Sequence, residues 1–251
     1  MIYFAPNIPH SKHRFFTKHG GYSSEKYQGL NASINSLDNK LSINNNLQFA
    51  AEHFNQNINN LNILTQGTSN KAVYISSPQQ FKEKADGAVT DKKEIILAIR
   101  TADCAPILFY DSHNQIIGAA HAGWRGALYG IIENTLELMI SIGADKTKIS
   151  AAIGPCLQKA SFECRSDMLQ EFLNINKKYK RFFKKKNNQQ WLFDAEKFCI
   201  HRLKQFGIKD ICTSKIDTYK DTDYFSYRRN CHNNLISAPL DFPTHLSTIT
   251  L

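Results

Sequence analysis

Short apolar segments separated by polar turns dominate the pattern of this chain. Three of them, at residues 95–100, 106–111 and 115–120, follow one another closely and are rich in the β-branched and aromatic side chains typical of strands. Apolar runs of this length, bounded by turn residues, predict buried strands. Further strands are expected at residues 62–64, 73–76, 149–153, 208–214 and 246–251.

The polar residues 112–114 join the second and third of these segments and predict a turn. We therefore expect an antiparallel hairpin in which Tyr110 lies opposite Gln115. Continued to the open end, this register places Cys104 opposite His121. Taken singly, each of these two is more typically an ordinary buried side chain. Together they are within reach of a shared metal, which makes a metal-binding or catalytic pair an equal alternative.

Other segments carry apolar side chains at helical spacing. After residues 121–126 (HAGWRG), the apolar positions from Leu128 to Met139 follow one helix face, and Gly143 ends the pattern. Hairpins and helices do not alternate regularly, so the chain is predicted to be α+β, and its 251 residues allow one large domain or two small ones. The other expected helices are 46–54 with Asn44 or Asn45 as its cap, 167–174, and 194–206 between the cap Asp194 and the stop Gly207.

The junction between the hairpin and the following helix suits an anion. Trp124, Arg125 and Gly126 stand where a strand turns into a helix N-terminus. Backbone N–H groups at that position have no partner within the helix, and the helix dipole is positive there. The guanidinium of Arg125 adds a planar donor that matches phosphate. We expect phosphate to bind at this corner.

Composition narrows the class of protein. The chain has 251 residues, enough to bury a full core. It has no stretch of about 18 apolar residues, so no membrane span or membrane partner is expected. The first residues lack the basic and apolar regions of a signal peptide. The six Cys are scattered without CxxC spacing, and reduced thiols in the cytoplasm are the simplest interpretation.

The net charge of +9, taken by itself, suggests nucleic-acid binding. Much of the excess lies in one run at residues 177–186 (KKYKRFFKKK). We favour a solvated connector or helix face for this run. Its aromatic residues Tyr179, Phe182 and Phe183 could stack on bases or form the buried side of the segment. No zinc-finger, RRM or KH signature is present, so no nucleic-acid partner is predicted.

Seven short motifs, read in order along the chain, resemble those of the YfiH-type family, whose members are described as multicopper polyphenol oxidases with a laccase domain and as purine nucleoside phosphorylases. The resemblance covers nearly the whole chain and implies a single domain over residues 1–251, built as a compact layered sandwich with mixed β-sheets inside and helices outside. The motifs are residues 16–23 (FTKHGGYS), 30–31 (LN), 85–90 (ADGAVT), 101–104 (TADC), 121–126 (HAGWRG), 153–156 (IGPC) and 224–229 (YFSYRR).

The resemblance also implies a metal centre. The family metal is bound by two His and one Cys, and Cys104 and His121 occupy two of these ligand positions. Zinc is the expected metal, with copper as the alternative. Three protein ligands leave a fourth position open, where a bound water or substrate atom is polarised. Asp103 would orient the site through its neighbours.

The implied reaction is metal-assisted phosphorolysis of adenosine, inosine or methylthioadenosine to the free base and ribose 1-phosphate. Adenosine deamination and copper-dependent phenol oxidation are also described for the family. Cys104, His121 and Arg125 would be the catalytic residues, with Arg125 holding the attacking phosphate. Lys18 and Asn31 would contact the substrate. Purine nucleosides and phosphate are therefore the expected partners.

Three positions depart from the family pattern. Thr68 stands where the first ligand His is expected, and a hydroxyl is a poor ligand for zinc or copper. Lys18 replaces an Arg and keeps only the charge. In the C-terminal motif, matched to residues 241–245, an Arg is lost and Pro243 replaces a Gly. His19 and His245 are candidates to supply the missing imidazole, although we expect neither to replace it fully.

These departures leave several functions open. The first is a working metal-assisted purine nucleoside phosphorylase. The second is a degenerate member of the family that keeps the fold, binds metal weakly and turns over little. A third is a hydrolase that uses Cys104 as its nucleophile and His121 as its base.

Overall fold

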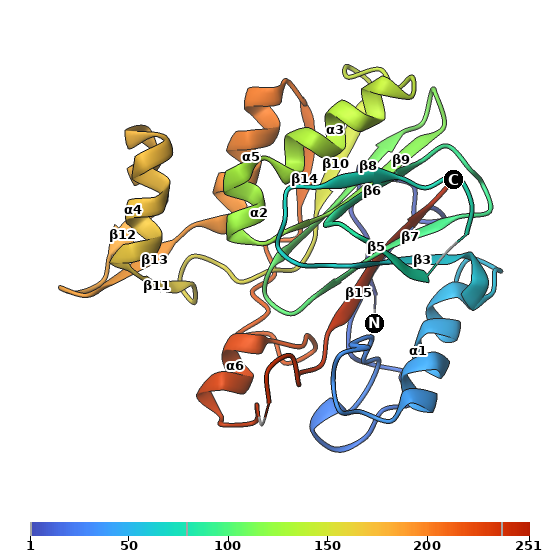
Figure 1. The fold of residues 1–251 in the computed structure, drawn as a ribbon, viewed down its shortest axis with the longest axis horizontal. Coiled ribbons are helices and arrows are strands. Elements are labelled where there is room, and N and C mark those ends of the chain that lie inside the picture. The colour runs from blue at the N-terminus through green and yellow to red at the C-terminus, as the bar shows by residue number, and fades with distance from the viewer. Residues whose placement is uncertain (1, 79, 237) are drawn as a thin grey trace.

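The computed structural model describes residues 2–78, 80–236 and 238–251. Two six-stranded β-sheets lie at the centre of the molecule, and helices cover the outer faces (Figure 1). This arrangement confirms the predicted α+β class and the layered sandwich of mixed sheets. In the described part of the chain, no helix combines the length and apolar character that crossing a membrane requires.

The first sheet contains both ends of the described chain. Helix α1 (Lys40–Glu52) packs on its outer face, preceded by the short 3-10 helix η1 (Glu25–Tyr27) and followed by η2 (Ile58–Asn60). Leu47 of this helix belongs to the same buried cluster as Ile63 and Ile96 of the sheet. In spatial order the strands are β1 (Ile2–Tyr3), β2 (His13–Phe16), β15 (His245–Thr250), β7 (Ile96–Thr101), β3 (Leu61–Thr65) and β5 (Gln80–Lys84).

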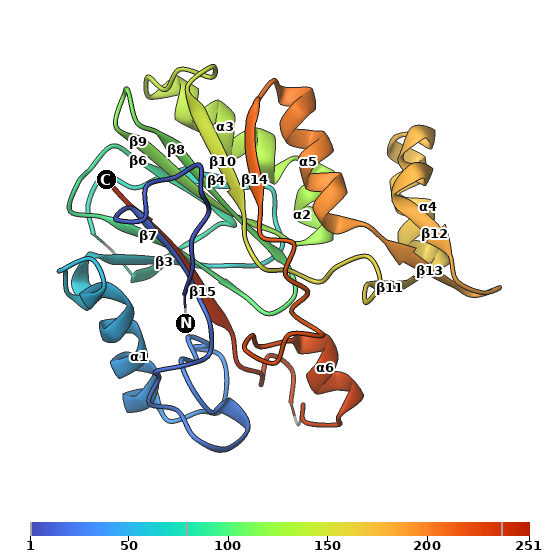
Figure 2. The same ribbon diagram turned by 180° about the vertical axis from the view of Figure 1, so that it is seen from behind.

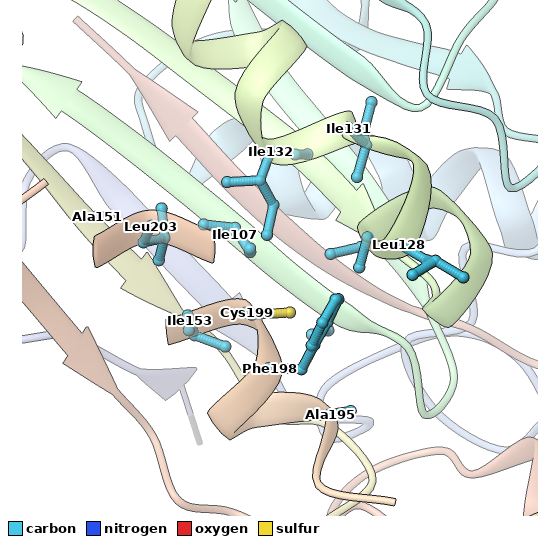
Figure 3. Close-up of a cluster of buried hydrophobic side chains, with 14 of the residues drawn as sticks. Ile107, Leu128, Ile131, Ile132, Ala151, Ile153, Ala195, Phe198, Cys199 and Leu203 are labelled. Carbon is cyan, nitrogen blue, oxygen red and sulfur yellow. The ribbon is translucent and has the colours of Figure 1, made fainter. Parts of the chain in front are cut away.

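The second sheet carries three helices on its outer face: α2 (Trp124–Tyr129), α3 (Ile131–Ser141) and α5 (Ala195–Phe206). Figure 3 shows side chains of these helices, among them Ile132, Phe198 and Leu203, meeting Ile107 and Ile153 from the strands. In spatial order the strands are β14 (Asp210–Thr213), β10 (Ile149–Ile153), β8 (Ala105–Asp111), β9 (Ile116–Ala122), β6 (Gly87–Thr90) and β4 (Ala72–Tyr74).

A third buried cluster lies between the two sheets. It combines Ile99 and Ile249 from the first sheet with Leu108 and Ile117 from the second. Successive side chains of a strand point to opposite faces, so Ile99 faces the other sheet whereas Ala98, one residue earlier, faces α1. Strands buried on both faces explain why these segments read as continuous apolar runs in the sequence.

A small lobe projects from one side of the molecule (Figure 2). It contains α4 (Ser166–Ile175), the 3-10 helix η3 (Lys177–Phe182) and a sheet of β11 (Glu163–Arg165), β13 (Gln190–Phe193) and β12 (Phe183–Lys185). Tyr179, Phe182 and Phe183 of the lysine-rich run are buried, at 5%, 2% and 7% exposure. The interpretation of these aromatic residues as the buried side of the segment is therefore confirmed.

The predicted hairpin exists, as β8 and β9, but its register was wrong by two residues. Tyr110 pairs with Ile117 instead of Gln115, and His121 pairs with Pro106 instead of Cys104. The Asp111 carboxylate accepts hydrogen bonds from the backbone N–H groups of residues 113 and 114, which makes the turn longer than expected. A shift of two residues keeps every side chain on its predicted face.

Two helix predictions also need correction. The helix after the hairpin is interrupted at Gly130, whose φ of +102° ends α2 and begins α3. The first helix begins earlier than predicted, because Asn39 and neither Asn44 nor Asn45 is its cap. Its side-chain oxygen accepts from the N–H groups of residues 41 and 42. The predicted cap Asp194 and stop Gly207 of α5 are confirmed.

Candidate active site

A cavity of about 720 Å³ opens at the ends of β3, β7 and β9. One part of its wall is polar and comes from the loops that follow β3 and β7. The other part is apolar and comes from α6 (Tyr227–His232) and the chain before β15. The lining residues are Ser33, Asn35, Gln66, Gly67, Thr68, Arg100, Thr101, Ala102, Cys104, His121, Tyr227, Ile236, Ala238, Pro239, Leu240, Phe242 and Thr244.

Asp86 organises the polar part of the cavity. This fully buried carboxylate accepts a hydrogen bond from His121 Nδ1 at 2.7 Å. It also accepts from the backbone N–H groups of Gly67, Thr68 and Ser69 at 3.2, 3.0 and 2.6 Å, and from the Ser69 hydroxyl. One buried acid therefore fixes both the imidazole ring on β9 and the loop after β3.

The electrostatics of this corner depend on the same contacts. Burial by itself lowers the pKa of His121, but the neighbouring Cys104 and Asp86 outweigh it and raise the pKa to about 10. Burial likewise acts to raise the pKa of Asp86, whereas the hydrogen bond and charge of His121 hold it below its ordinary value. The imidazole of His121 is therefore protonated at neutral pH.

The three positions that match the family ligands converge around Gly123. A Cβ placed on this glycine would lie 3.4 Å from Cys104 Sγ, 3.4 Å from Thr68 Cγ2 and 3.6 Å from His121 Cε1. The corrected register thus still brings Cys104 and His121 together, because Cys104 precedes β8 beside Gly123. Thr68 turns its methyl group toward this point and donates its hydroxyl to the Gly67 carbonyl at 2.7 Å.

The residues at this corner do not fit the three-ligand metal centre that the resemblance implies. No group of three His, Cys, Asp or Glu that could hold a metal occurs among the described residues. His19 is half-exposed and bonded to Asp223 at 2.8 Å, and His245 Nε2 bonds Thr101 Oγ1 at 3.0 Å inside the first sheet. Cys104 and His121 are therefore left with a threonine where a third imidazole would stand.

Arg125 stands at the start of a helix, as predicted, but outside the residues that line the cavity. Its side chain is 57% exposed, and Nε lies 3.7 Å from Glu171 Oε1. The guanidinium carbon is 4.2 Å from the centre of the Trp124 ring. Lys18 also lies away from the lining, and its backbone bonds Asp223 and Leu30.

Asn31 is a structural residue of the cavity's surroundings. It is fully buried, and its amide nitrogen donates to Ser36 and Asp38. Its amide oxygen accepts from the N–H groups of Ser33 and Thr244, both of which line the cavity. The amide thus has its two donors and two acceptors in use, and it positions the lining from outside.

Asp103 anchors the turn that precedes Cys104. Its φ of +95° is unusual for a residue with a side chain. The buried carboxylate accepts from Thr218 Oγ1 at 2.7 Å and from the backbone N–H of Arg228 at 2.7 Å. These bonds tie the turn to the C-terminal part of the chain and so hold Cys104 in place.

Sequence reasoning missed several residues of the site. Asp86 lies in the motif at residues 85–90, and its place in that motif was the only available signal. Arg100 ends an apolar strand, where a charged residue is an exception worth noting. The apolar wall formed by Ile236, Ala238, Pro239, Leu240 and Phe242 has no hydrophobic periodicity, and only the fold brings it to the cavity.

Comparison with known proteins agrees with this architecture. The model of the family described as multi-copper polyphenol oxidoreductase laccase matches residues 12–234. A purine nucleoside phosphorylase of Rickettsia conorii is 34% identical over 237 residues, covering 90% of this chain and 94% of that protein. The purine nucleoside phosphorylase YfiH of Escherichia coli is 29% identical, covering 85% and 86%. The solved structure of a Neisseria meningitidis protein matches with a TM-score of 0.87 at 26% identity, over 100% and 98% of the two chains.

The fold and the motif-bearing cavity thus define a laccase-domain protein. This chain belongs to the YfiH-type family within that class, as its motifs predicted.

Proposed function

We propose that the chain is a purine nucleoside phosphorylase that takes adenosine, inosine or methylthioadenosine into the cavity. The observation that carries the proposal is the convergence of Thr68, Cys104 and His121 at one wall of this cavity. Relatives bearing that name match almost the whole chain. The ligand positions of the family, its fold and a cavity of nucleoside size therefore occur together.

The apolar wall suits the purine base. Tyr227 and Phe242 lie edge to face with ring centres 4.8 Å apart, and Ile236, Pro239 and Leu240 extend the same surface. A flat aromatic base gains both apolar burial and stacking energy against such a surface. This orientation directs the ribose toward Cys104 and His121.

The polar end of the cavity must transfer a proton to the leaving base. In phosphorolysis a phosphate oxygen bonds to C1′ of the ribose while the bond from C1′ to the base nitrogen breaks. His121, held by Asp86 and protonated at neutral pH, donates a proton to the departing purine. The proton of the attacking hydrogen phosphate then restores the imidazolium, so the reaction consumes no net proton.

A second candidate is a degenerate member of the family with little turnover. Thr68 favours it, because zinc in catalytic sites takes three protein ligands and this corner offers two. A metal bound by Cys104 and His121 alone would be held weakly. Adenosine deamination and copper-dependent phenol oxidation would depend on the same two donors.

The two candidates are separated by incubating the purified protein with adenosine or inosine, with and without phosphate and with and without added zinc. Chromatography then measures the free base and the deaminated nucleoside. We expect phosphate-dependent release of free base, lost in His121→Ala. Absence of base release under all four conditions would refute the phosphorylase and leave the degenerate member.

A further inference from the structure

The cavity contains one buried permanent cation. Of the described residues that line it, Arg100 is the sole Lys or Arg, and none is an Asp or Glu. Its residue is 8% exposed, and burial lowers the pKa of Arg100 to about 10, so it stays charged at neutral pH. A guanidinium removed from water in a cavity without lining carboxylates favours an anionic ligand.

Arg100 is held rigidly at the end of β7. The side chain of Gln66 bonds both backbone groups of Arg100, donating to its carbonyl at 2.8 Å and accepting from its N–H at 2.8 Å. One guanidinium nitrogen donates to the Leu64 carbonyl at 3.2 Å. Such support limits the rotamers that Arg100 adopts and so reduces the entropy lost when it binds a ligand.

Thr244 provides a second and independent sign of a polar ligand. It lines the same cavity and is 8% exposed. Its Oγ1 is buried and has no hydrogen-bond partner among the described residues. Buried hydroxyls are almost always hydrogen-bonded, so this one points to a group that enters the cavity.

We propose that Arg100 and Thr244 bind a phosphate group in the cavity, either inorganic phosphate or the 5′-phosphate of a nucleotide. A guanidinium matches phosphate through two parallel hydrogen bonds, and a hydroxyl adds a third. The inference rests on the proposed function for its biological meaning, since a phosphorylase needs phosphate beside the nucleoside. It moves the anion from the corner at Arg125, which lies outside the cavity, to the end of β7.

The test is isothermal titration of inorganic phosphate and, separately, of AMP into five forms of the full chain: wild type, Arg100→Met, Arg100→Lys, Thr244→Val and Arg125→Met. Arg165→Met is the matched control, because Arg165 is exposed on β11 in the projecting lobe. Loss of a charge-assisted hydrogen-bond pair should weaken phosphate binding about 10-fold or more in Arg100→Met. We expect a smaller loss, about threefold to tenfold, in Arg100→Lys and Thr244→Val.

Thermal unfolding of each variant shows whether the fold is kept. If Arg100→Met does not fold, Arg100→Lys and Thr244→Val decide the matter, since both replacements preserve the shape of the site. If the Arg100 and Thr244 variants bind inorganic phosphate more weakly than the wild type, the free ion is the ligand. If they bind only AMP more weakly, the ligand is the 5′-phosphate of a nucleotide. The proposal is overturned if the wild type binds neither, or if the Arg100 and Thr244 variants bind both as tightly as the wild type.

Titration without turnover separates this proposal from the proposed function. If the wild type binds phosphate through Arg100 but cleaves no nucleoside, the phosphate site is supported and the phosphorylase activity is refuted. The opposite result is a wild type that cleaves nucleosides and whose phosphate affinity falls in Arg125→Met but not in Arg100→Met. It would support the phosphorylase activity and refute the phosphate site at Arg100.

Discussion

Two buried histidines of this chain, His121 in the cavity wall and His245 in the first sheet, differ in charge. Both are nearly free of solvent, at 8% and 1% exposure. Burial and the nearby Arg229 lower the pKa of His245 to about 3, whereas Cys104 and Asp86 overcome burial at His121 and raise its pKa to about 10. Burial and a nearby cation thus keep one imidazole neutral, whereas Cys104 and a bonded carboxylate keep the other protonated.

The comparison assigns the chemistry of the cavity to Asp86 as much as to His121. His245 bonds only the Thr101 hydroxyl among the described residues, and its Nδ1 has no partner there. At neutral pH His245 is therefore uncharged and cannot act as an acid. At His121, in contrast, the Asp86 carboxylate holds Nδ1 at 2.7 Å and, together with Cys104, keeps the imidazole protonated at neutral pH.

Replacement of Asp86 should give the largest effect. Asp86→Ala leaves His121 and three backbone N–H groups without their buried acceptor. Removing one partner of a buried ion pair typically costs about 3–5 kcal/mol, and we expect a loss of this size in urea unfolding. The control Asp91→Ala removes an exposed carboxylate paired with Lys92 and should cost about 1 kcal/mol or less. Equal losses in the two variants would contradict the account.

The two histidines should also act oppositely on the pH dependence of stability. The folded pKa of His245 is below its unfolded value, so the unfolded chain binds the extra proton as the pH falls. Its contribution is present above about pH 6.5 and should decline by about 3 kcal/mol between pH 6.5 and 4. The contribution of His121, whose pKa is raised, is present below about pH 6.5 and is lost as the pH rises through 10.

Urea unfolding at several pH values checks these slopes, with His245→Asn flattening the acid side. The exposed His113 in the β8–β9 turn provides the matched control, and His113→Asn should leave both slopes unchanged. If NMR finds His245 titrating near the pKa of a free imidazole in the folded protein, the contrast between the two sites fails.

A smaller effect is expected at the apolar wall, which binds without charge. Phe242→Ala removes one ring of the pair with Tyr227. A lost aromatic contact of about 1.5 kcal/mol raises the KM for adenosine about 10-fold, while kcat changes little. Steady-state kinetics with adenosine and inosine measure this directly. A loss confined to kcat would place Phe242 in the chemical step and not in base binding.

The smallest effect should come from Arg125. Its side chain is largely exposed and lies near Glu171, and exposed ion pairs contribute about 0–1 kcal/mol. Arg125→Ala should therefore change the KM for phosphate by less than about threefold. If the KM for phosphate rises 10-fold or more, phosphate binds beside Arg125 at the N-terminus of α2, as the motif suggested.

Much of the fold was predictable because its central strands are buried on both faces. The strands at residues 96–101, 105–111 and 116–122 read as continuous apolar runs, and only the hairpin register was displaced. The short strands β2, β6 and β11 to β13 were not predicted, because three or four residues carry too little periodicity. The break at Gly130 depends on one left-handed residue within an otherwise helical pattern.

Some residues of the candidate site were likewise predictable from the sequence, and others were not. Cys104 and His121 were predictable as neighbours because one hairpin joins them. Arg100 and Thr244 lie far apart in sequence and meet at the cavity only through the pairing of β7 with β15. Arg125 stands four residues from His121, yet the turn into α2 carries its side chain away from the cavity. Closeness in a motif therefore did not imply that both side chains line the same cavity.

The central claim concerns the position where Thr68 stands beside Cys104 and His121. Its most direct test measures zinc content and nucleoside turnover together in wild type and Thr68→His, with Thr147→His, on an exposed turn, as control. The account predicts substoichiometric zinc in the wild type and the control. In Thr68→His it predicts about one zinc per chain, since the added imidazole completes a set of three protein ligands, and lower base release, because a zinc-bound His121 has no proton left to donate to the leaving base. A wild type that already holds one zinc tightly and turns over well would contradict it.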